Sequence, residues 1–431
     1  MRAALRMKNL RFATRLRHQS LQNTAIFLLV AGVAFQNVPA VAGISVFETF
    51  FLISALLLML GLAATGGRMR FRPNPVTSWF LFTLVAFALP AIITETPRYL
   101  LTMTFALSSG VLALLASDAE PRAAARGALL SGFVLAFTAI GQRYGVVPVF
   151  DFSKVSSFRD FILSGYTGLI PTRGSFGIVL MTSLAFLLAS LIETRSRPIR
   201  AVALGGIAMT GLAAVVSLSR STMVAYLVVL TSFAIFHLSS KRLRGGGAKR
   251  FRSAYIVLPG LAILASWLFL SGLVTDLIDR LIAVRAGSVE TRLDTISEAL
   301  EQVPEAWLLG TGSELTGSLS HLVHNAYVAV LVERGVFGFT GFLMLNLTAF
   351  FVLQSRLFTT HSDRRYIYSC LLAGFLGVQT ELMFFRGYLS IPYWVFIAIL
   401  LSYLNHAAIA RRGDPSRFPG TENNATATYS R

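Results

Sequence analysis

Apolar stretches long enough to cross a lipid bilayer recur along the chain from Thr24 to His406. A membrane-spanning helix needs about 20 mostly apolar residues, and a soluble core does not need so many such stretches. The composition agrees, since 13% of the residues are charged, against about 25% in soluble proteins. The sequence therefore predicts an all-α polytopic membrane protein. Its twelve candidate spans are 24–41, 46–64, 77–93, 99–116, 127–143, 175–192, 201–218, 221–238, 254–273, 336–353, 366–385 and 391–409.

The basic residues predict how these spans are oriented. A net charge of +18 could suggest a nucleic-acid partner, but the Lys and Arg residues gather in alternate connections between spans. Together with the two terminal tails, these connections hold 27 of the 38 Lys and Arg residues. Basic residues concentrate on the cytoplasmic side of membrane proteins. Both termini are therefore expected to be cytoplasmic, and no nucleic-acid partner is expected.

The spans and connections divide the chain into five parts. Residues 1–23 are expected to form a basic cytoplasmic flank, because the apolar run after them lacks the small-residue cleavage site of a secretory signal peptide. Nine spans occupy 24–273, a long external connection occupies 274–335, and three spans follow in 336–409. The polar tail 410–431 contains two prolines and is expected to be disordered.

Two external connections are long enough to carry function. The connection 144–174 is rich in aromatic residues, which favours an interfacial belt or a lid on the headgroups; stacking on sugars is the alternative. The longer connection contains an amphipathic helix from Ser288 to Val303, followed by Pro304. A glycine turn at Gly310–Gly312 follows, whose backbone N–H groups could face an anion. The apolar stripe of the helix is expected to consist of Leu293, Ile296, Leu300 and Val303.

Histidine is the best candidate for acid–base chemistry. Of the six histidines, only His321 and His324 fall on the external side. The helical pattern begins at Asn325, so His324 lies at a helix start, where the helix dipole disfavours imidazolium. A neutral imidazole there could act as a general base; the alternative is a helix cap or a headgroup contact. No metal site is expected, because no acidic ligand lies near the two histidines and the single cysteine, Cys370, lies in an apolar run.

Two external arginines have no acidic residue placed to pair with them locally. Arg220 follows a short external turn, and Arg292 has no acidic residue three or four positions away on its helix. An arginine at membrane depth is costly and usually has a partner or a function. Two guanidinium groups suit a diphosphate, whose oxygens fit the planar fork of arginine. The alternative is ion pairing across the fold, for example with Glu290, Glu333 or Glu381.

The external loop and the helix after it resemble the O-antigen ligase and O-antigen polymerase family. His324-Asn325, nine residues, Gly335, two residues and Gly338 resemble the family's histidine-to-glycine motif. The resemblance extends from about residue 290 to residue 340, and Ser219-Arg220 resembles an earlier arginine motif. That second match is looser, since Val224 stands where the motif often has leucine.

The resemblance implies a membrane glycosyltransferase of the C-type architecture in a bacterial inner membrane, with its active face periplasmic. It implies no metal and no cofactor. The donor would be an undecaprenyl-diphosphate-linked glycan, and the acceptor a lipid-linked glycan or lipid A core. By resemblance, Arg220 and Arg292 would bind the diphosphate and His324 would activate the acceptor hydroxyl. Supporting roles fall to Asn325, Tyr327 and Glu333, and to Gly335 and Gly338, which permit close helix packing.

Three functions remain in competition. The first is a polymerase that joins lipid-linked repeat units into an exopolysaccharide, capsule or O-antigen, favoured by the likeness of the stretch from His324 to Phe342 to exopolysaccharide polymerases. The second is a ligase that passes a finished chain to lipid A core. The third is a transporter or flippase of lipid-linked sugars, which would often show repeated halves, and no internal repeat is visible.

Overall fold

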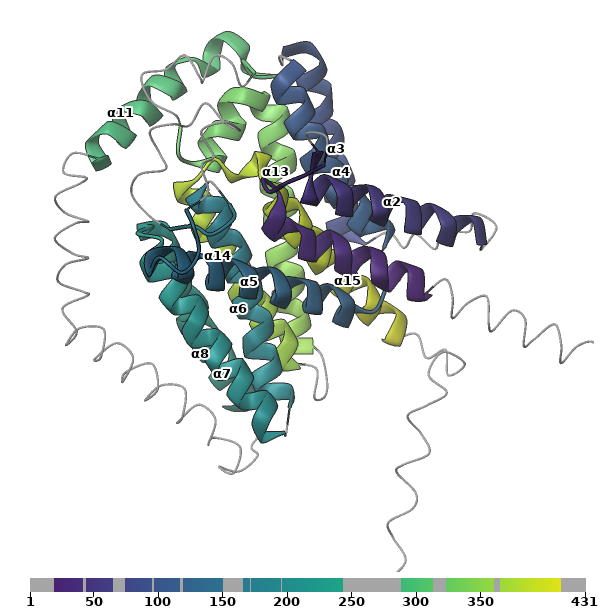
Figure 1. Ribbon diagram of the computed structural model, residues 1–431. Coiled ribbons are helices and arrows are strands. Elements are labelled where there is room, and N and C mark those ends of the chain that lie inside the picture. The colour runs from purple at the N-terminus through teal and green to yellow at the C-terminus, as the bar shows by residue number, and fades with distance from the viewer. Residues whose placement is uncertain are drawn as a thin grey trace, which may run out of the picture.

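The computed structural model describes residues 19–41, 44–64, 74–94, 97–116, 119–149, 166–170, 172–194, 196–242, 288–312, 323–359 and 365–411. Within them the chain is a bundle of α-helices with one small β-hairpin (Figure 1). The chain starts with the apolar helical segment Gln19–Phe35, which ends in the 3-10 turn η1 (Val33–Phe35) and leads to β1 (Pro39–Val41) and β2 (Ile44–Ser45). The helices that follow are α2 (Val46–Ala64), α3 (Pro75–Thr94), α4 (Pro97–Leu115), α5 (Pro121–Arg143), α6 (Arg173–Glu193), α7 (Arg197–Val216), α8 (Arg220–Arg242), α11 (Ser288–Glu301), α13 (Ala326–Thr359), α14 (Arg365–Phe384) and α15 (Ile391–Arg411), with the 3-10 turns η5 (Val303–Ala306) and η6 (Gly387–Leu389).

Eight of the described helices are long and apolar enough to cross a membrane: α2, α3, α5, α6, α7, α8, α13 and α14. The apolar segment Gln19–Phe35 and the apolar parts of α4 and α15 are shorter. The chain is therefore an all-α polytopic membrane protein, which confirms the fold class predicted from hydropathy. Each predicted span coincides with a described helix, except 254–273, which lies outside the described residues.

Several predicted spans have different bounds in the structure, and two of these differences bear on the fold. The helix of the first, predicted over 24–41, already ends at Phe35. Pro39 explains this, because proline lacks an N–H group and disfavours the helical conformation in the residue before it. The tenth span was predicted to begin at residue 336, but α13 starts at Ala326 and passes through a kink at Gly335.

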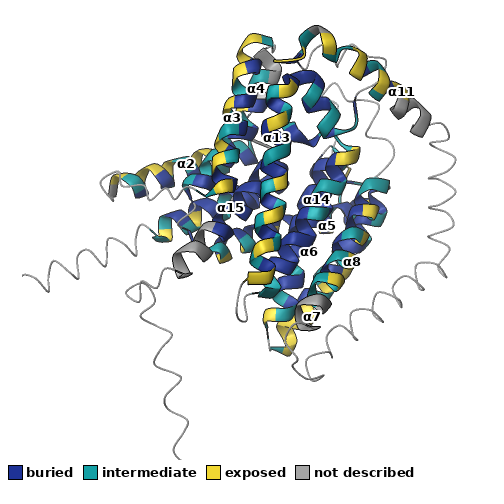
Figure 2. Cartoon of the chain, turned by 180° about the vertical axis from the view of Figure 1, so that it is seen from behind, coloured by how far each residue is buried: buried dark blue, intermediate teal, exposed yellow. Residues whose placement is uncertain are grey.

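Helices α6 and α14 form the centre of the bundle, and α2 lies at its edge (Figure 2). Of the membrane-spanning window of α6, 83% is buried, against 22% for α2. Lipid tails supply no hydrophobic force between helices, so close packing must hold them together. Small residues allow it: a Cβ on Gly132 of α5 would lie 2.2 Å from Ser183 of α6, and one on Gly374 of α14 would lie 2.7 Å from Ala185.

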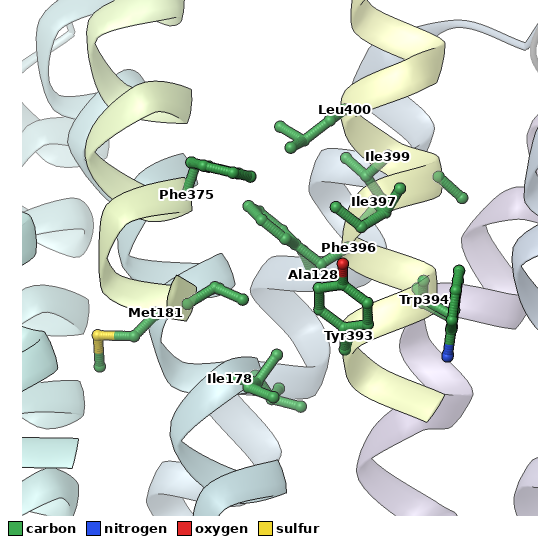
Figure 3. Close-up of a cluster of buried hydrophobic side chains, with 14 of the residues drawn as sticks. Ala128, Ile178, Met181, Phe375, Tyr393, Trp394, Phe396, Ile397, Ile399 and Leu400 are labelled. Carbon is green, nitrogen blue, oxygen red and sulfur yellow. The ribbon is translucent and has the colours of Figure 1, made fainter. Parts of the chain in front are cut away.

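The start of α15 packs between two groups of helices. Its Phe396 points toward Phe375 of α14 (Figure 3). Trp394 points to the other side, and its ring packs edge-to-face 5.9 Å from that of Phe80 in α3. The indole Nε1 of Trp394 donates a hydrogen bond to the Tyr388 carbonyl at 2.7 Å. This contact fixes the short loop before α15, which lies at the candidate site.

Candidate functional site

One end of the bundle brings together loops that are far apart in the sequence. The Nη1 of Arg173, at the start of α6, lies 3.5 Å from the carbonyl oxygen of Leu218, in the turn before α8. The hydroxyls of Ser175 in α6 and Ser390, just before α15, lie 2.9 Å apart. The starts of α6, α8 and α15 therefore meet at this end.

Two residues of α14 contact the first turns of α8 and α13 at the same end. The Tyr327 hydroxyl, in the first turn of α13, donates a hydrogen bond to the side-chain oxygen of Gln379. Two residues further along α14, the Glu381 carboxyl faces the hydroxyl of Thr222 in the first turn of α8. The stretch from Gln379 to Glu381 therefore links the starts of the two helices that carry the predicted histidine and arginine.

His324 lies directly before the residue that caps α13. The side-chain oxygen of Asn325 accepts hydrogen bonds from the backbone N–H groups of Tyr327 at 2.9 Å and Val328 at 3.2 Å. A side-chain oxygen at this position satisfies helix-start donors that have no partner within the helix. Asn325 thereby fixes the backbone next to His324, whose side chain is half-buried. The second predicted histidine, His321, lies outside the described residues.

Gly335 interrupts α13 with a kink that opens its backbone to the external loop. Its φ of 64° and ψ of −171° belong to a region of backbone space that is essentially restricted to glycine. The N–H of Val336 donates to the carbonyl of Trp307 at 2.8 Å, and the N–H of Phe337 donates to that of Leu308 at 3.3 Å. The carbonyls of the loop after α11 therefore accept hydrogen bonds from both of these N–H groups.

The loop segment from Trp307 to Gly312, called here the strap, also donates to α13. The N–H of Thr311 donates to the Val332 carbonyl at 2.9 Å, and the N–H of Gly312 donates to the Glu333 carbonyl at 3.2 Å. The prediction that this glycine turn offers its N–H groups to an anion is therefore wrong for these two groups. The kink leaves helix carbonyls in need of donors, and the strap supplies them.

Glu333 lies fully buried in an ion pair beside the kink. Its Oε2 lies 2.5 Å from the Nη2 of Arg386 in the loop after α14, and the Tyr388 hydroxyl donates a hydrogen bond to the same oxygen. Burial is the largest effect that raises the pKa of Tyr388 to about 12, so this hydroxyl remains a donor at neutral pH. The guanidinium of Arg334 lies over the Tyr388 ring, 5.8 Å from its centroid. The ring thus packs against a cation as well.

A second set of polar side chains forms a hydrogen-bonded network around the buried Asn346 of α13. The amide nitrogen of Gln379 donates to the side-chain oxygen of Asn346 at 2.8 Å, and the Tyr393 hydroxyl donates to the same oxygen at 3.1 Å. With Tyr327, these side chains join α13, α14 and α15. Buried polar groups that are mutually hydrogen-bonded specify one helix arrangement, so this network fixes the position of the α13 start.

Arg220 is the first residue of α8 and is half-buried. The turn before it contains Leu218 with a φ of 52°, a conformation that bulky residues rarely adopt. The hydroxyl of Ser219 accepts a hydrogen bond from the N–H of Thr222 at 3.4 Å and so caps the helix. It also lies 3.0 Å from the hydroxyl of Ser221. Arg220 is therefore held between two serines that bond to each other.

Arg292 lies on α11, a helix that packs against α13; its side chain is outside the described part of the structure. The buried face of this helix differs from the predicted stripe. Thr295 and Ala299 are buried, whereas Leu300 is 42% exposed. Small residues on the face toward α13 let the two helices approach closely.

A model of the family described as O-antigen ligase matches residues 204–343. The match runs from within α7 to within α13 and so includes Arg220, Arg292 and His324. This part of the chain is similar to the O-antigen ligase family. A search of the curated proteins found no match.

The match supports a membrane enzyme of the O-antigen ligase and polymerase type, with lipid-linked glycans as the general class of substrate. Its predicted site residues fall on different elements of the fold. Arg220 begins α8, and His324 and Asn325 begin α13. Gly335 forms the kink, and a Cβ on Gly338 would lie 3.5 Å from the Ala86 carbonyl of α3.

Two further residues join the site through the fold alone. Arg173 reaches the turn before Arg220 from 45 positions away in the sequence. Glu381 was predicted only as a possible ion-pair partner, and it faces the hydroxyls of Ser221 and Thr222. No local sequence pattern connects these positions. Among the described residues, no three His, Cys, Asp or Glu side chains gather as metal ligands would.

Proposed function

We propose that the chain is a glycosyltransferase that joins undecaprenyl-diphosphate-linked repeat units into an exopolysaccharide, capsule or O-antigen at the periplasmic face of a bacterial inner membrane. In this proposal Arg220 and Arg292 bind the donor diphosphate, and His324 activates the acceptor hydroxyl. Asn325 and Tyr327 hold the start of the helix that positions His324.

The observation that carries the proposal is the link through α14. Tyr327, three residues after His324, bonds to Gln379, and Thr222, two residues after Arg220, faces Glu381. The segments that carry His324 and Arg220, far apart in the sequence, are thereby held at one end of the bundle. Transfer from a lipid diphosphate needs both groups at the surface where the lipid headgroup lies.

The proposed reaction balances with these groups alone. The acceptor hydroxyl oxygen attacks the anomeric carbon of the donor while the bond from that carbon to the phosphate oxygen breaks. His324 takes the hydroxyl proton as a general base and later releases it to water. Arg220 and Arg292 stabilise the negative charge that develops on the departing diphosphate. Guanidinium groups can do here what a divalent cation does in metal-dependent transferases.

A ligase that transfers the finished chain to lipid A core is the second candidate. It uses the same donor and the same chemistry, and the matched family is described as O-antigen ligase. The two functions differ only in the acceptor, so one assay distinguishes them.

The test is turnover by purified protein in lipid nanodiscs with a synthetic polyprenyl-diphosphate oligosaccharide. A ladder of longer lipid-linked glycans supports the polymerase, and transfer only to added lipid A core supports the ligase. Absence of both products in correctly folded protein would contradict the proposal. The same assay with EDTA tests the absence of a metal: turnover is expected to persist, and loss that a divalent cation restores would contradict the mechanism.

A further inference from the structure

Glu381 is a carboxyl group buried inside a membrane-spanning helix. It lies in α14, three residues before the helix ends at Phe384, and its side chain is fully buried. Within the described residues, neither carboxyl oxygen accepts a hydrogen bond of standard geometry. An acidic residue at membrane depth is costly and usually marks a function. The proposed transfer chemistry does not use it.

The carboxyl is aimed at the first turn of α8. It faces the hydroxyls of Thr222 and Ser221, and a Cβ on Gly177 of α6 would lie 2.0 Å from its Oε1 and 2.8 Å from the Thr222 Oγ1. Any side chain at position 177 would displace this arrangement. Three helices therefore form the place that holds the carboxyl against the start of α8.

Contacts at this helix start lead directly to Arg220. Ser221 bonds through its hydroxyl to that of Ser219, at 3.0 Å, and Ser219 caps the helix. Arg220 lies between these two serines. A carboxylate beside a helix N-terminus is also stabilised by the positive end of the helix dipole, so Glu381 and the first turn of α8 stabilise each other.

We propose that Glu381 is a positioning residue for donor binding, which acts through Ser221 and Thr222 to fix the turn that presents Arg220 to the lipid diphosphate. This inference rests on the proposed function. Glu381 does not touch the donor; it sets the orientation of the guanidinium fork, whose two N–H groups must align with phosphate oxygens. A misaligned fork binds the ground state and the transition state of the donor equally poorly.

Removal of the carboxyl is therefore expected to raise the KM for the donor and to change kcat little, because lost uniform binding appears in KM. For Glu381→Leu we expect a rise of roughly tenfold in KM, within the range that misplacement of a binding group causes. Glu381→Gln keeps the size and the hydrogen-bonding capacity of the side chain and should restore most of the affinity. A residue that only packs the bundle would show no such rescue and no preference for KM.

Thr222→Val tests the same connection with a smaller change. It removes the hydroxyl that faces Glu381, and Thr210→Val in α7 is its matched control, since Thr210 is also buried and its hydroxyl donates to carbonyls of its own helix. Thr222→Val should raise the donor KM, and Thr210→Val should leave it unchanged. If Glu381→Leu fails to accumulate in the membrane, this pair of variants decides the question.

The final experiment is a double-mutant cycle with Arg220→Lys, measured on purified protein in nanodiscs with the synthetic polyprenyl-diphosphate oligosaccharide. Residues that act as a unit give non-additive effects, so Glu381→Leu or Thr222→Val should raise KM less than about twofold once Arg220 is lysine. Additive effects in the cycle, or an unchanged donor KM in Thr222→Val, would overturn the inference while wild-type turnover still supports the proposed function. Absence of wild-type turnover would instead overturn the proposed function.

Discussion

At the scale of the residue, the position of His324 suits a base better than a permanent cation. It directly precedes Asn325, whose side chain caps α13. The positive end of the helix dipole disfavours imidazolium at this position, and a general base must be neutral to accept a proton. The cap also fixes the backbone on one side of the histidine, which limits the directions in which the imidazole can point.

Replacement of His324 by alanine should abolish product formation, because the loss of a general base typically costs about 10²–10⁴-fold in rate. The measurement is the initial rate of glycan extension at saturating donor. His321→Ala is the matched control, and a much smaller effect is expected from it. Donor binding should persist in His324→Ala. A His324→Ala enzyme that keeps substantial turnover would show that the base is another residue.

Glu333 is the next candidate for that base if His324 is not the base, and its surroundings favour a structural role. One carboxylate oxygen already meets Arg386 and Tyr388. Loss of one member of a buried ion pair leaves the other charge uncompensated, at a cost of about 3–5 kcal/mol. Glu333→Gln is therefore expected to lower the thermal unfolding temperature in detergent and the amount of protein in the membrane.

The control for this prediction is activity per folded molecule. If Glu333 is structural, the folded fraction of Glu333→Gln retains turnover, and Arg386→Leu has a similar effect on stability. Normal stability together with lost turnover would instead assign Glu333 to the chemistry.

The residues of the site differ in how far the sequence could predict them. Arg220 and His324 stand in short motifs, and no acidic residue is close to Arg220 in the sequence, so local sequence identifies both. Arg173 and Glu381 reach the site from other helices, and the contacts that matter, with Leu218 and Thr222, exist only once the helices pack. No spacing along the chain predicts such contacts.

At the scale of the element, the kink at Gly335 joins two parts of the external loop region to one helix. The strap pairs with α13 through four backbone hydrogen bonds, which involve the carbonyls of Val332 and Glu333 and the N–H groups of Val336 and Phe337. The strap follows α11, which carries Arg292. The kink therefore sets how the arginine-bearing helix lies relative to the helix that begins after His324.

Gly335→Ala should detach the strap and reduce turnover strongly. A Cβ there would lie 2.3 Å from the Leu308 carbonyl oxygen, and the φ of 64° with ψ of −171° is a conformation that alanine avoids. Faster hydrogen exchange at the strap amides, measured by mass spectrometry, is the direct readout. Gly145→Ala is the matched control, since Gly145 also has a positive φ but has nothing within 4 Å of its Cβ position. Unchanged exchange in Gly335→Ala would contradict this account of the kink.

Hydropathy predicted the helices well, because the length of an apolar run is a local property of the sequence. The predicted bounds of α2, 46–64, are those of the structure. Helix interruptions were harder to predict. Gly335 lies within an apolar helical pattern, and the sequence alone is equally consistent with a glycine that lets two helices pack closely. The kink is explained only by the strap, whose backbone forms hydrogen bonds with α13 on both sides of Gly335. The buried face of α11 was shifted for a similar reason, since Thr295 and Ala299 face a neighbouring helix that the periodicity of α11 cannot reveal.

At the scale of the whole molecule, the fold and the charge pattern agree about which loops share a side. The starts of α6, α8 and α15 meet at one end, and the predicted topology assigns all three to the external side. That end also carries Arg220 and the start of α13. The connections rich in Lys and Arg are assigned to the opposite side.

Fusions of a reporter enzyme that is active only outside the cytoplasm test this orientation. We expect activity when the reporter follows Ser288 and no activity when it follows Lys249 or Arg417, because Lys and Arg residues concentrate in the connections kept on the cytoplasmic side. A reporter that is active only in the cytoplasm, fused at the same positions, is the control and should give the inverse pattern. The fusion at Arg417 counts the spans, since an even number returns the chain to the side on which it started. External activity at that position would mean an odd number of spans. Activity after Lys249 together with none after Ser288 would place the end that carries Arg220 and His324 in the cytoplasm, out of reach of a periplasmic glycan.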